Sequence, residues 1–382
     1  MGHGAAKPRS WLRRMRDDAL DRKAGRSRAR SKATFIGISG SSAKSTAAAL
    51  LAHILTAQSR VRRQVKFNDR RAILKTVARA SSGFDFVVVE AGIGGKNRMK
   101  PMVEALQPDV AIMTLIEIEH KSAFRTHEAI AAEKGELIEA LRPGGLAILN
   151  GDDPHVMSMA SRTNERVVVF GQSEICDYRA TNIYAAFPDR LRLTLGWANG
   201  SLPLRTNFVG EHFWLPTLAA AVAAIELGVP PDIVAARVAT FEPLAERCGV
   251  ISIPNGPDFI LDTTKAPWHS IKLAFDVVAT ATSPRKRIVL GHMSDFAGSD
   301  QKYRNAYRWA REVADQVIFV GQHAHRSKAT QEDRDSGRFV AFSTPEEVCE
   351  HIRQTAIPGE VILLKGSVDL HLDPDFPYGS IN

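Results

Sequence analysis

The residues with the clearest chemical character form one short segment, residues 37–46, which reads GISGSSAKST. An apolar, strand-like run precedes this segment, and an alanine-rich, helix-like run follows it. The order of strand, glycine-rich turn, Lys-Ser-Thr and helix is typical of a phosphate-binding loop, in which backbone N–H groups face phosphate oxygens. In such a loop Lys44 would contact the β- and γ-phosphates, and the Ser45 hydroxyl would bind Mg²⁺. The segment therefore predicts nucleotide binding.

Ala43 stands where a glycine usually precedes the lysine of such a loop. Its methyl group could crowd a phosphate, or a small backbone shift could accommodate it. A serine-rich loop that binds no phosphate is therefore the alternative, and the rest of the chain must decide between the two.

Three further polar residues follow the loop in chain order: Glu90, His120 and Lys134. Glu90 and His120 each come after an apolar, β-branched run, and Lys134 lies in a helix-like segment. Ligands of open α/β sheets bind outside the carboxyl ends of the strands, so Glu90 is well placed to hold Mg²⁺. Each of the three has an ordinary interpretation as a surface residue. Their order and spacing favour a shared site.

The elements that would position these residues alternate between strand-like and helix-like runs, which predicts an α/β fold with helices on both faces of a parallel sheet. We expect a central nucleotide-binding domain over residues 34–240, with a small antiparallel insert at residues 165–209. A second, smaller Rossmann-like α/β domain is expected over residues 241–382. Residues 1–33 are expected to form a basic N-terminal tail.

The composition excludes several classes of protein. The chain has 382 residues and a formal net charge of +8. No apolar run reaches the roughly 18 residues that a membrane helix needs. Three widely spaced cysteines suggest neither a disulfide framework nor a zinc cluster, so a cytoplasmic location is expected.

The positive charge is concentrated near the N-terminus, where residues 7–32 contain eleven Lys or Arg against three Asp. Such a segment could bind an anionic surface or a partner subunit. Nucleic acid is a less suitable partner, because the segment lacks the interleaved aromatic residues of a single-strand binder. A solvated helix or a disordered lead-in is the simpler interpretation.

These motifs together resemble those of the Mur ligase family, the ATP-dependent amide ligases that include the muramyl-peptide ligases and folylpolyglutamate synthase. Residues 37–45 match the family's phosphate loop except at Ala43, and residues 90–96 look like folylpolyglutamate synthase. His120 and Lys134 sit where the family has a Mg²⁺-binding histidine and a lysine that reacts with CO₂ to form a carbamate. Further similar segments extend the resemblance to about residue 370, so it covers both expected domains.

The resemblance implies ATP and Mg²⁺ as cofactors, and an acyl-phosphate reaction that joins an amino acid or small peptide to an acidic small molecule. It implies nucleotide binding by Gly37, Gly40, Ser41, Ser42, Ala43, Lys44, Ser45, Thr46, Arg247 and Asp262. It implies metal binding by Ser45, Glu90, His120 and carbamylated Lys134. It implies catalytic roles for Lys44, His120, Lys134, Arg247 and Lys265.

Three departures from the family pattern affect these expectations. Only the basic segment precedes residue 34, so we expect the UDP-sugar-binding domain of the muramyl ligases to be missing. Phe213 and Pro216 replace asparagines that help the family to hold adenine. Together with Ala43, they leave a non-catalytic nucleotide-binding or regulatory subunit as the alternative. The retained phosphate- and metal-binding residues favour an enzyme.

Overall fold

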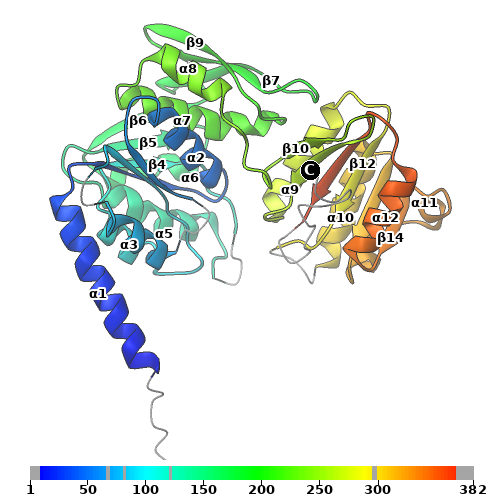
Figure 1. Ribbon diagram of the computed structural model, residues 1–382, viewed down its shortest axis with the longest axis horizontal. Helices are drawn as coiled ribbons and strands as arrows, with labels where there is room; N and C mark the ends of the chain where they lie inside the picture. Colours follow the sequence, from blue (N-terminus) through cyan, green and yellow to red (C-terminus); the bar gives the residue numbers. More distant parts are fainter. Residues whose placement is uncertain (1–8, 66–68, 81–82, 120–122, 295–298, 367–382) are drawn as a thin grey trace, which may run out of the picture. The chain divides into compact units, whose positions relative to one another are not determined.

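The computed structural model describes residues 9–65, 69–80, 83–119, 123–294 and 299–366, with residues 9–15 described as backbone (Figure 1). The chain divides into two compact units. Unit 1 comprises residues 1–181, 194–204 and 215–239, and unit 2 comprises residues 182–193, 205–214 and 240–382. No helix within the described ranges is long and apolar enough to cross a membrane.

Unit 1 is built on a nine-stranded sheet with the order β2-β3-β1-β4-β5-β6-β7-β8-β9. Each pair of neighbours from β2 to β7 is parallel. The central strands are almost completely buried, as their apolar, β-branched sequences predict. The strands are β1 (Thr34–Ser39), β2 (Val61–Gln64), β3 (Phe86–Glu90), β4 (Val110–Met113), β5 (Leu146–Asn150), β6 (Arg166–Gly171), β7 (Tyr178–Tyr184), β8 (Arg192–Trp197) and β9 (Gly200–Arg205).

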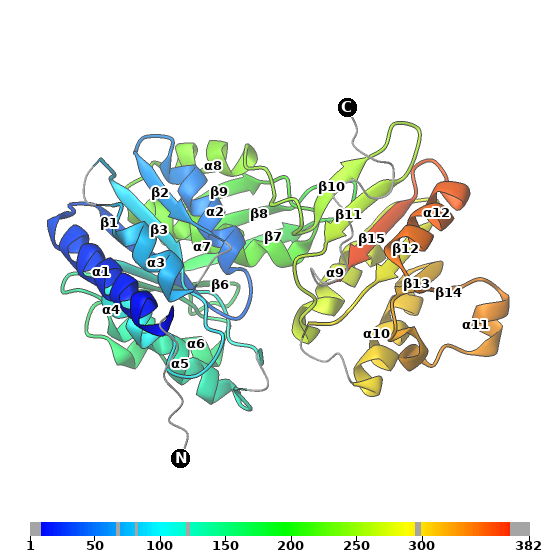
Figure 2. The ribbon, with the colours of Figure 1, turned by 60° about the horizontal axis from the view of Figure 1, so that its bottom comes forward.

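Helices cover both faces of this sheet (Figure 2). One face carries α3 (Arg70–Val77), α4 (Lys100–Leu106), α5 (His127–Glu139) and α6 (Pro154–Met157), whose apolar residues join one core with the strands. The alanine-rich helix α2 (Lys44–Leu55) packs against β1, β2 and β3 and contacts α8 (Pro231–Ala239). Helix α7 (Trp214–Glu226), from its second residue on, and the 3₁₀ helix Ala160–Arg162 complete unit 1, whereas the 3₁₀ helix Glu211–Phe213 lies in unit 2.

The segment expected to be an antiparallel insert is continuous with the main sheet. Strand β6 reads RVVVFG and pairs in parallel with β5, so its apolar run extends the parallel sheet. Strands β8 and β9 are joined by residues 198–199 alone, a connection of hairpin length. The insert at residues 165–209 is therefore part of one larger sheet, and its parallel strand β6 was wrongly assigned to an antiparallel unit.

The expectation of a solvated N-terminal tail is wrong for the end of helix α1 (Arg9–Arg30). Ala24, Ser27 and Arg28 are buried, and the Ser27 hydroxyl donates a hydrogen bond of 2.6 Å to the carbonyl of Val77. The Arg28 guanidinium forms an ion pair of 2.8 Å with Asp109. Because a buried guanidinium needs such a partner, this part of the basic segment belongs to the folded core of unit 1.

Unit 2 contains a six-stranded sheet with the order β10-β11-β15-β12-β13-β14, in which only β10 is antiparallel to its neighbour. The strands are β10 (Gly249–Ser252), β11 (Asp258–Asp262), β12 (Lys286–Leu290), β13 (Gln316–Val320), β14 (Phe339–Phe342) and β15 (Val361–Lys365). The helices are α9 (Trp268–Thr280), α10 (Asp300–Val313), α11 (Gln331–Asp335) and α12 (Pro345–Thr355), with a 3₁₀ helix at Ala324–Ser327. Helices α9 and α10 pack together, and α12 packs on β13 and β14. This second parallel α/β sheet confirms the predicted fold class.

Candidate functional site

The glycine-rich loop between β1 and α2 has a backbone conformation that requires glycine at position 40. Gly40 has φ of 139°, and a Cβ atom there would lie 1.9 Å from the Thr114 hydroxyl. That hydroxyl donates a hydrogen bond of 2.7 Å to the Ser42 carbonyl. The Ser41 hydroxyl donates to the Glu117 carbonyl at 2.8 Å and accepts from the Glu117 N–H at 2.9 Å. The loop is therefore fixed against the segment that leaves β4.

Ala43 occupies the left-handed region with φ of 68°, immediately before the first residue of α2. A residue with a Cβ atom is strained in this region, whereas glycine is not. Ala43 thus adopts a backbone conformation that is unstrained for glycine but strained for alanine. Ala43 therefore has a left-handed backbone conformation at the position where a glycine is usual.

Ser45 and Glu90 meet at the carboxyl edge of the sheet. The Ser45 hydroxyl donates a hydrogen bond of 2.8 Å to the Glu90 carboxylate, although the two residues are 45 positions apart. Glu90 ends β3, which is aligned with β1 so that Glu90 is the partner of Ile38. Glu90 is only 2% exposed. A hydroxyl and a carboxylate side by side provide the hard oxygen ligands that Mg²⁺ prefers, so these residues fit the expected metal.

Lys44 and Lys134 converge on one backbone atom of the loop. Both ammonium groups donate hydrogen bonds to the Gly40 carbonyl, at 2.5 Å from Lys44 and 2.8 Å from Lys134. Lys134 lies on α5 and is completely buried, with an ion pair of 2.7 Å to Glu119. An ammonium group does not ligate a cation, so Lys134 fits a metal site only after conversion to an anionic carbamate. His120 lies outside the described residues.

Glu119 and Glu133 are two residues of this region that the sequence did not single out as site residues. Glu119 balances the charge of Lys134. The Glu133 carboxylate accepts hydrogen bonds from three successive backbone N–H groups, those of Asn97, Arg98 and Met99, at 2.7–2.9 Å. It therefore fixes the loop that follows β3. The sequence feature that could have identified them is their place in the chain, because each glutamate directly precedes a predicted site residue.

The remaining predicted site residues lie in unit 2. Asp262 ends β11, and Lys265 is exposed on the loop that follows. In this loop the Thr264 hydroxyl donates a hydrogen bond of 3.1 Å to the Glu246 carbonyl. That bond links the loop to the segment of Arg247. Unit 2 thus brings Arg247, Asp262 and Lys265 together, as unit 1 does for the phosphate loop, Glu90 and Lys134.

His212 and Phe213 are structural parts of unit 2. Burial, as the main cause, lowers the pKa of His212 to about 4, so the imidazole is neutral at pH 7. Phe213 is buried and stacks on Phe208 with a centroid separation of 4.5 Å. The phenyl ring of Phe213 therefore contributes to the packing of the core. Pro216 lies in the first turn of α7, where proline is tolerated.

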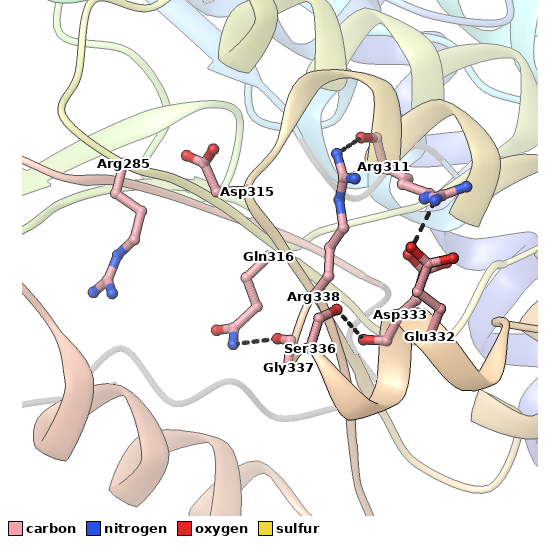
Figure 3. A pocket seen from close by; sticks show the side chains of 9 residues that line it. All are labelled: Arg285, Arg311, Asp315, Gln316, Glu332, Asp333, Ser336, Gly337 and Arg338. Atoms are coloured by element: carbon pink, nitrogen blue, oxygen red, sulfur yellow. Dashed lines mark hydrogen bonds and ion pairs between the residues drawn. The ribbon is translucent and has the colours of Figure 1, made fainter.

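A cavity of about 430 Å³ in unit 2 lies elsewhere (Figure 3). Arg285, Gln316 and Arg338 are at the amino ends of β12, β13 and β14, whereas Asp262 is at the carboxyl end of its strand. The charges in the cavity are largely matched internally, since Arg311 pairs with Asp333 at 3.1 Å and Arg285 pairs with Glu360. The cavity is therefore separate from the candidate site.

Comparisons with known proteins agree with this geometry. The sequence models described as "Mur ligase middle domain" and "Mur ligase, glutamate ligase domain" match residues 38–224 and 246–368. The UDP-N-acetylmuramoyl-tripeptide–D-alanyl-D-alanine ligase of Mycobacterium tuberculosis is 27% identical over 87% of this chain and 70% of its own length. The UDP-N-acetylmuramate–L-alanine ligase of Sorangium cellulosum is 27% identical over 88% of this chain and 72% of its own. The match to the D-alanyl-D-alanine ligase of Mycobacterium bovis covers 53% of that protein.

Solved structures show the same fold. The structure of MurF from Acinetobacter baumannii has a TM-score of 0.82 and 23% identity, over 93% of this chain and 78% of that one. Folylpolyglutamate synthase of Mycobacterium tuberculosis, solved with ADP and AMPPCP, has a TM-score of 0.72 and 17% identity, over 93% of each chain.

Proposed function

The chain belongs to the Mur ligase family, whose members are ATP-dependent amide-forming ligases, and we propose that it joins a carboxylic acid to an amine through an acyl phosphate. The observation that carries this proposal is the hydrogen bond of 2.8 Å between Ser45 and Glu90, directly behind a loop that presents Lys44. This hydrogen bond supports a phosphate site and a Mg²⁺ site next to each other at the carboxyl edge of the sheet.

The reaction needs activation because a carboxylate is not electrophilic. A carboxylate oxygen attacks the γ-phosphorus of ATP, and ADP leaves. The amine nitrogen then attacks the acyl carbon, the bond between that carbon and the phosphate oxygen breaks, and inorganic phosphate leaves while the nitrogen loses a proton to solvent. Negative charge develops on the transferred oxygens, so positioning and electrostatic stabilisation supply most of the catalysis.

The residues of unit 1 have different proposed roles in this reaction. Lys44 and backbone N–H groups of the loop hold the phosphates, except the N–H of Ser41, which donates to the Leu115 carbonyl at 2.8 Å. Ser45 and Glu90 hold Mg²⁺, which when bound neutralises phosphate charge. We assign a second metal position to His120 and carbamylated Lys134, on the family pattern. Before modification, the Lys134 ammonium is held by Glu119 and the Gly40 carbonyl.

Arg247, Asp262 and Lys265 are the proposed contribution of unit 2. We assign Arg247 and Asp262 to the nucleotide, and Lys265 to the reacting groups. The amine is proposed to be an amino acid or a small peptide, and the names of the relatives make D-alanyl-D-alanine the first to test. A cytoplasmic location, and a partner bound by exposed basic side chains of α1, stay predictions.

ADP release tests the proposed function. The protein is incubated with Mg-ATP, a pool of small carboxylic acids and a pool of amines that includes D-alanyl-D-alanine. We expect ADP release only when an acid and an amine are both present, and we expect Lys44→Ala to abolish it. Equal ADP release by wild type and Lys44→Ala in every pool would contradict the proposal.

A further inference from the structure

A buried ion pair joins the ends of two neighbouring strands in unit 2. Asp262 and Lys365 are aligned partners on the parallel strands β11 and β15, at the last residue of each. The Lys365 ammonium lies 2.6 Å from the Asp262 carboxylate. It also donates a hydrogen bond of 3.0 Å to the carbonyl of Lys265. One buried cation therefore contacts both ends of the four-residue segment 262–265, which begins with the last residue of β11.

The two charges differ in their access to solvent. The side chain of Lys365 is 2% exposed, whereas that of Asp262 is 13% exposed. A ligand at the carboxyl edge of the sheet could therefore reach the carboxylate, while the ammonium stays behind it. Ligands of open parallel sheets bind at this edge. The side chain that is more exposed there, that of Asp262, is thus the one that a bound ligand would contact.

Two titratable side chains near the pair, those of His212 and Cys248, carry no charge at neutral pH, whereas the nearby Arg247 is a further cation that acts on Cys248. Burial is the main cause of the low pKa of His212, about 4, with Asp262 and Lys365 as smaller influences. Burial also raises the pKa of the Cys248 thiol well above its ordinary value. Asp262 and Lys365 thus face each other beside two neutral side chains, in a buried setting where a charge without its partner is strongly destabilised.

We propose that Lys365 is a positioning residue, which holds the Asp262 carboxylate and the following loop so that Asp262 accepts hydrogen bonds from the ribose hydroxyls of the bound nucleotide. This inference rests on the proposed function, because it takes the nucleotide-binding role of Asp262 from it. Lys365 itself touches neither the nucleotide nor the reacting atoms.

The test compares two nucleotides in four proteins. Wild type, Lys365→Met, Asp262→Asn and the double variant are titrated by calorimetry with Mg-ATP and with Mg-2′,3′-dideoxyATP, which lacks both ribose hydroxyls. Wild type should bind ATP more tightly by about tenfold or more, since a buried acceptor is left unpaired by the dideoxy compound. Lys365→Met and Asp262→Asn should each lose this preference, and the double variant should be no worse than Asp262→Asn.

Thermal unfolding supplies a readout that is independent of nucleotide. Each single variant leaves one buried charge or polar group without its partner, so Tm should fall by roughly 6–15 °C. The double variant should regain part of that loss. Lys272→Met, which removes an exposed lysine of α9, should leave Tm and the nucleotide preference unchanged. If Lys365→Met fails to fold, the role of Lys365 is still tested by comparing the Tm and the nucleotide preference of Asp262→Asn with those of the double variant and of Lys365→Arg.

The outcomes separate the two proposals. A Lys365→Met protein that keeps the full ribose preference overturns the inference. A wild-type protein that binds both nucleotides equally also overturns it, together with the role of Asp262, but leaves the phosphate loop assignment standing. A wild-type protein that binds neither nucleotide overturns the proposed function as well.

Discussion

The Ser45 hydroxyl, in the first turn of α2, donates a hydrogen bond of 2.8 Å to the Glu90 carboxylate, at the end of β3. The second residue of the helix that follows the glycine-rich turn and the last residue of β3 thus lie side by side. The proposed metal site therefore includes two specific oxygen atoms, one from each side chain. Each of them can be removed by a single substitution.

Replacing either member of this pair should weaken the use of Mg²⁺. We expect Ser45→Ala and Glu90→Gln each to raise the Mg²⁺ concentration for half-maximal ADP release by about 10–100-fold. Ser45→Thr is the matched control, because it keeps the hydroxyl and should stay close to wild type. A magnesium titration measures this directly, and unchanged titrations in both disruptive variants would remove these residues from the metal site.

Ala43→Gly should stabilise the protein. Ala43 has φ of 68°, and relief of this strain should raise the free energy of unfolding by about 1 kcal/mol. Affinity for Mg-ATP should stay equal or increase, because the loop path is unchanged. Ala236→Gly on the exposed side of α8 is the control and should lower stability by about 1 kcal/mol. Urea unfolding compares the two, and a loss of stability in Ala43→Gly would show that the strain estimate is wrong.

Lys134→Ala should lower ADP release by at least about 100-fold if a carbamate acts at this position. A short carboxylic acid such as acetate should partly restore activity, because it can occupy the vacated space and supply the anionic oxygens. Lys134→Met fills the same space and should not be rescued. Full activity of the alanine variant without acetate would rule out the assignment.

His212 should make stability depend on pH. Its pKa is lowered by burial to about 4 in the folded chain, against 6.5 for an unperturbed histidine. Between these values the unfolded chain binds more protons, so stability is fully present above pH 6.5 and is lost as pH falls toward 4, by about 3 kcal/mol in total. The difference in pH dependence between wild type and His212→Gln measures this contribution. Parallel pH curves for the two proteins would contradict it.

Arg28 should matter to stability where other arginines of α1 do not. Arg28→Met removes the ion pair with Asp109 and should cost roughly 2–3 kcal/mol, since Asp109 keeps partial access to water. Arg22→Met on the exposed side of the same helix should change stability by less than about 0.5 kcal/mol. Urea unfolding followed by circular dichroism compares the pair. Equal effects would mean that α1 is held in another way.

Local patterns predicted the parts of the structure that depend on local geometry. The strand, turn and helix around residues 37–46 could be predicted because they are contiguous in sequence, and the position of Glu90 because it ends a strand at the carboxyl edge of the sheet. The α/β alternation likewise predicted two sheets. Strand β6 was misjudged because its short apolar run does not reveal which strand it pairs with.

Long-range ion pairs could not be predicted in this way. Lys365 is 103 residues from Asp262, and Arg28 is 81 residues from Asp109. In sequence, Arg28 is one basic residue in a basic run, and only the position of its carboxylate partner distinguishes it. Glu119 was missed for the same reason, because the burial of Lys134 is a property of the assembled core.

The central claim is that this chain forms a C–N bond at the expense of ATP. The most direct measurement is mass spectrometry of a reaction containing Mg-ATP, isotopically labelled D-alanyl-D-alanine or another labelled amine, and a pool of carboxylic acids. We predict a labelled product whose mass is the sum of acid and amine less one water, formed only with ATP and absent with Lys44→Ala. ATP hydrolysis that proceeds without any labelled adduct, whichever amine and acid are supplied, would contradict the ligase assignment.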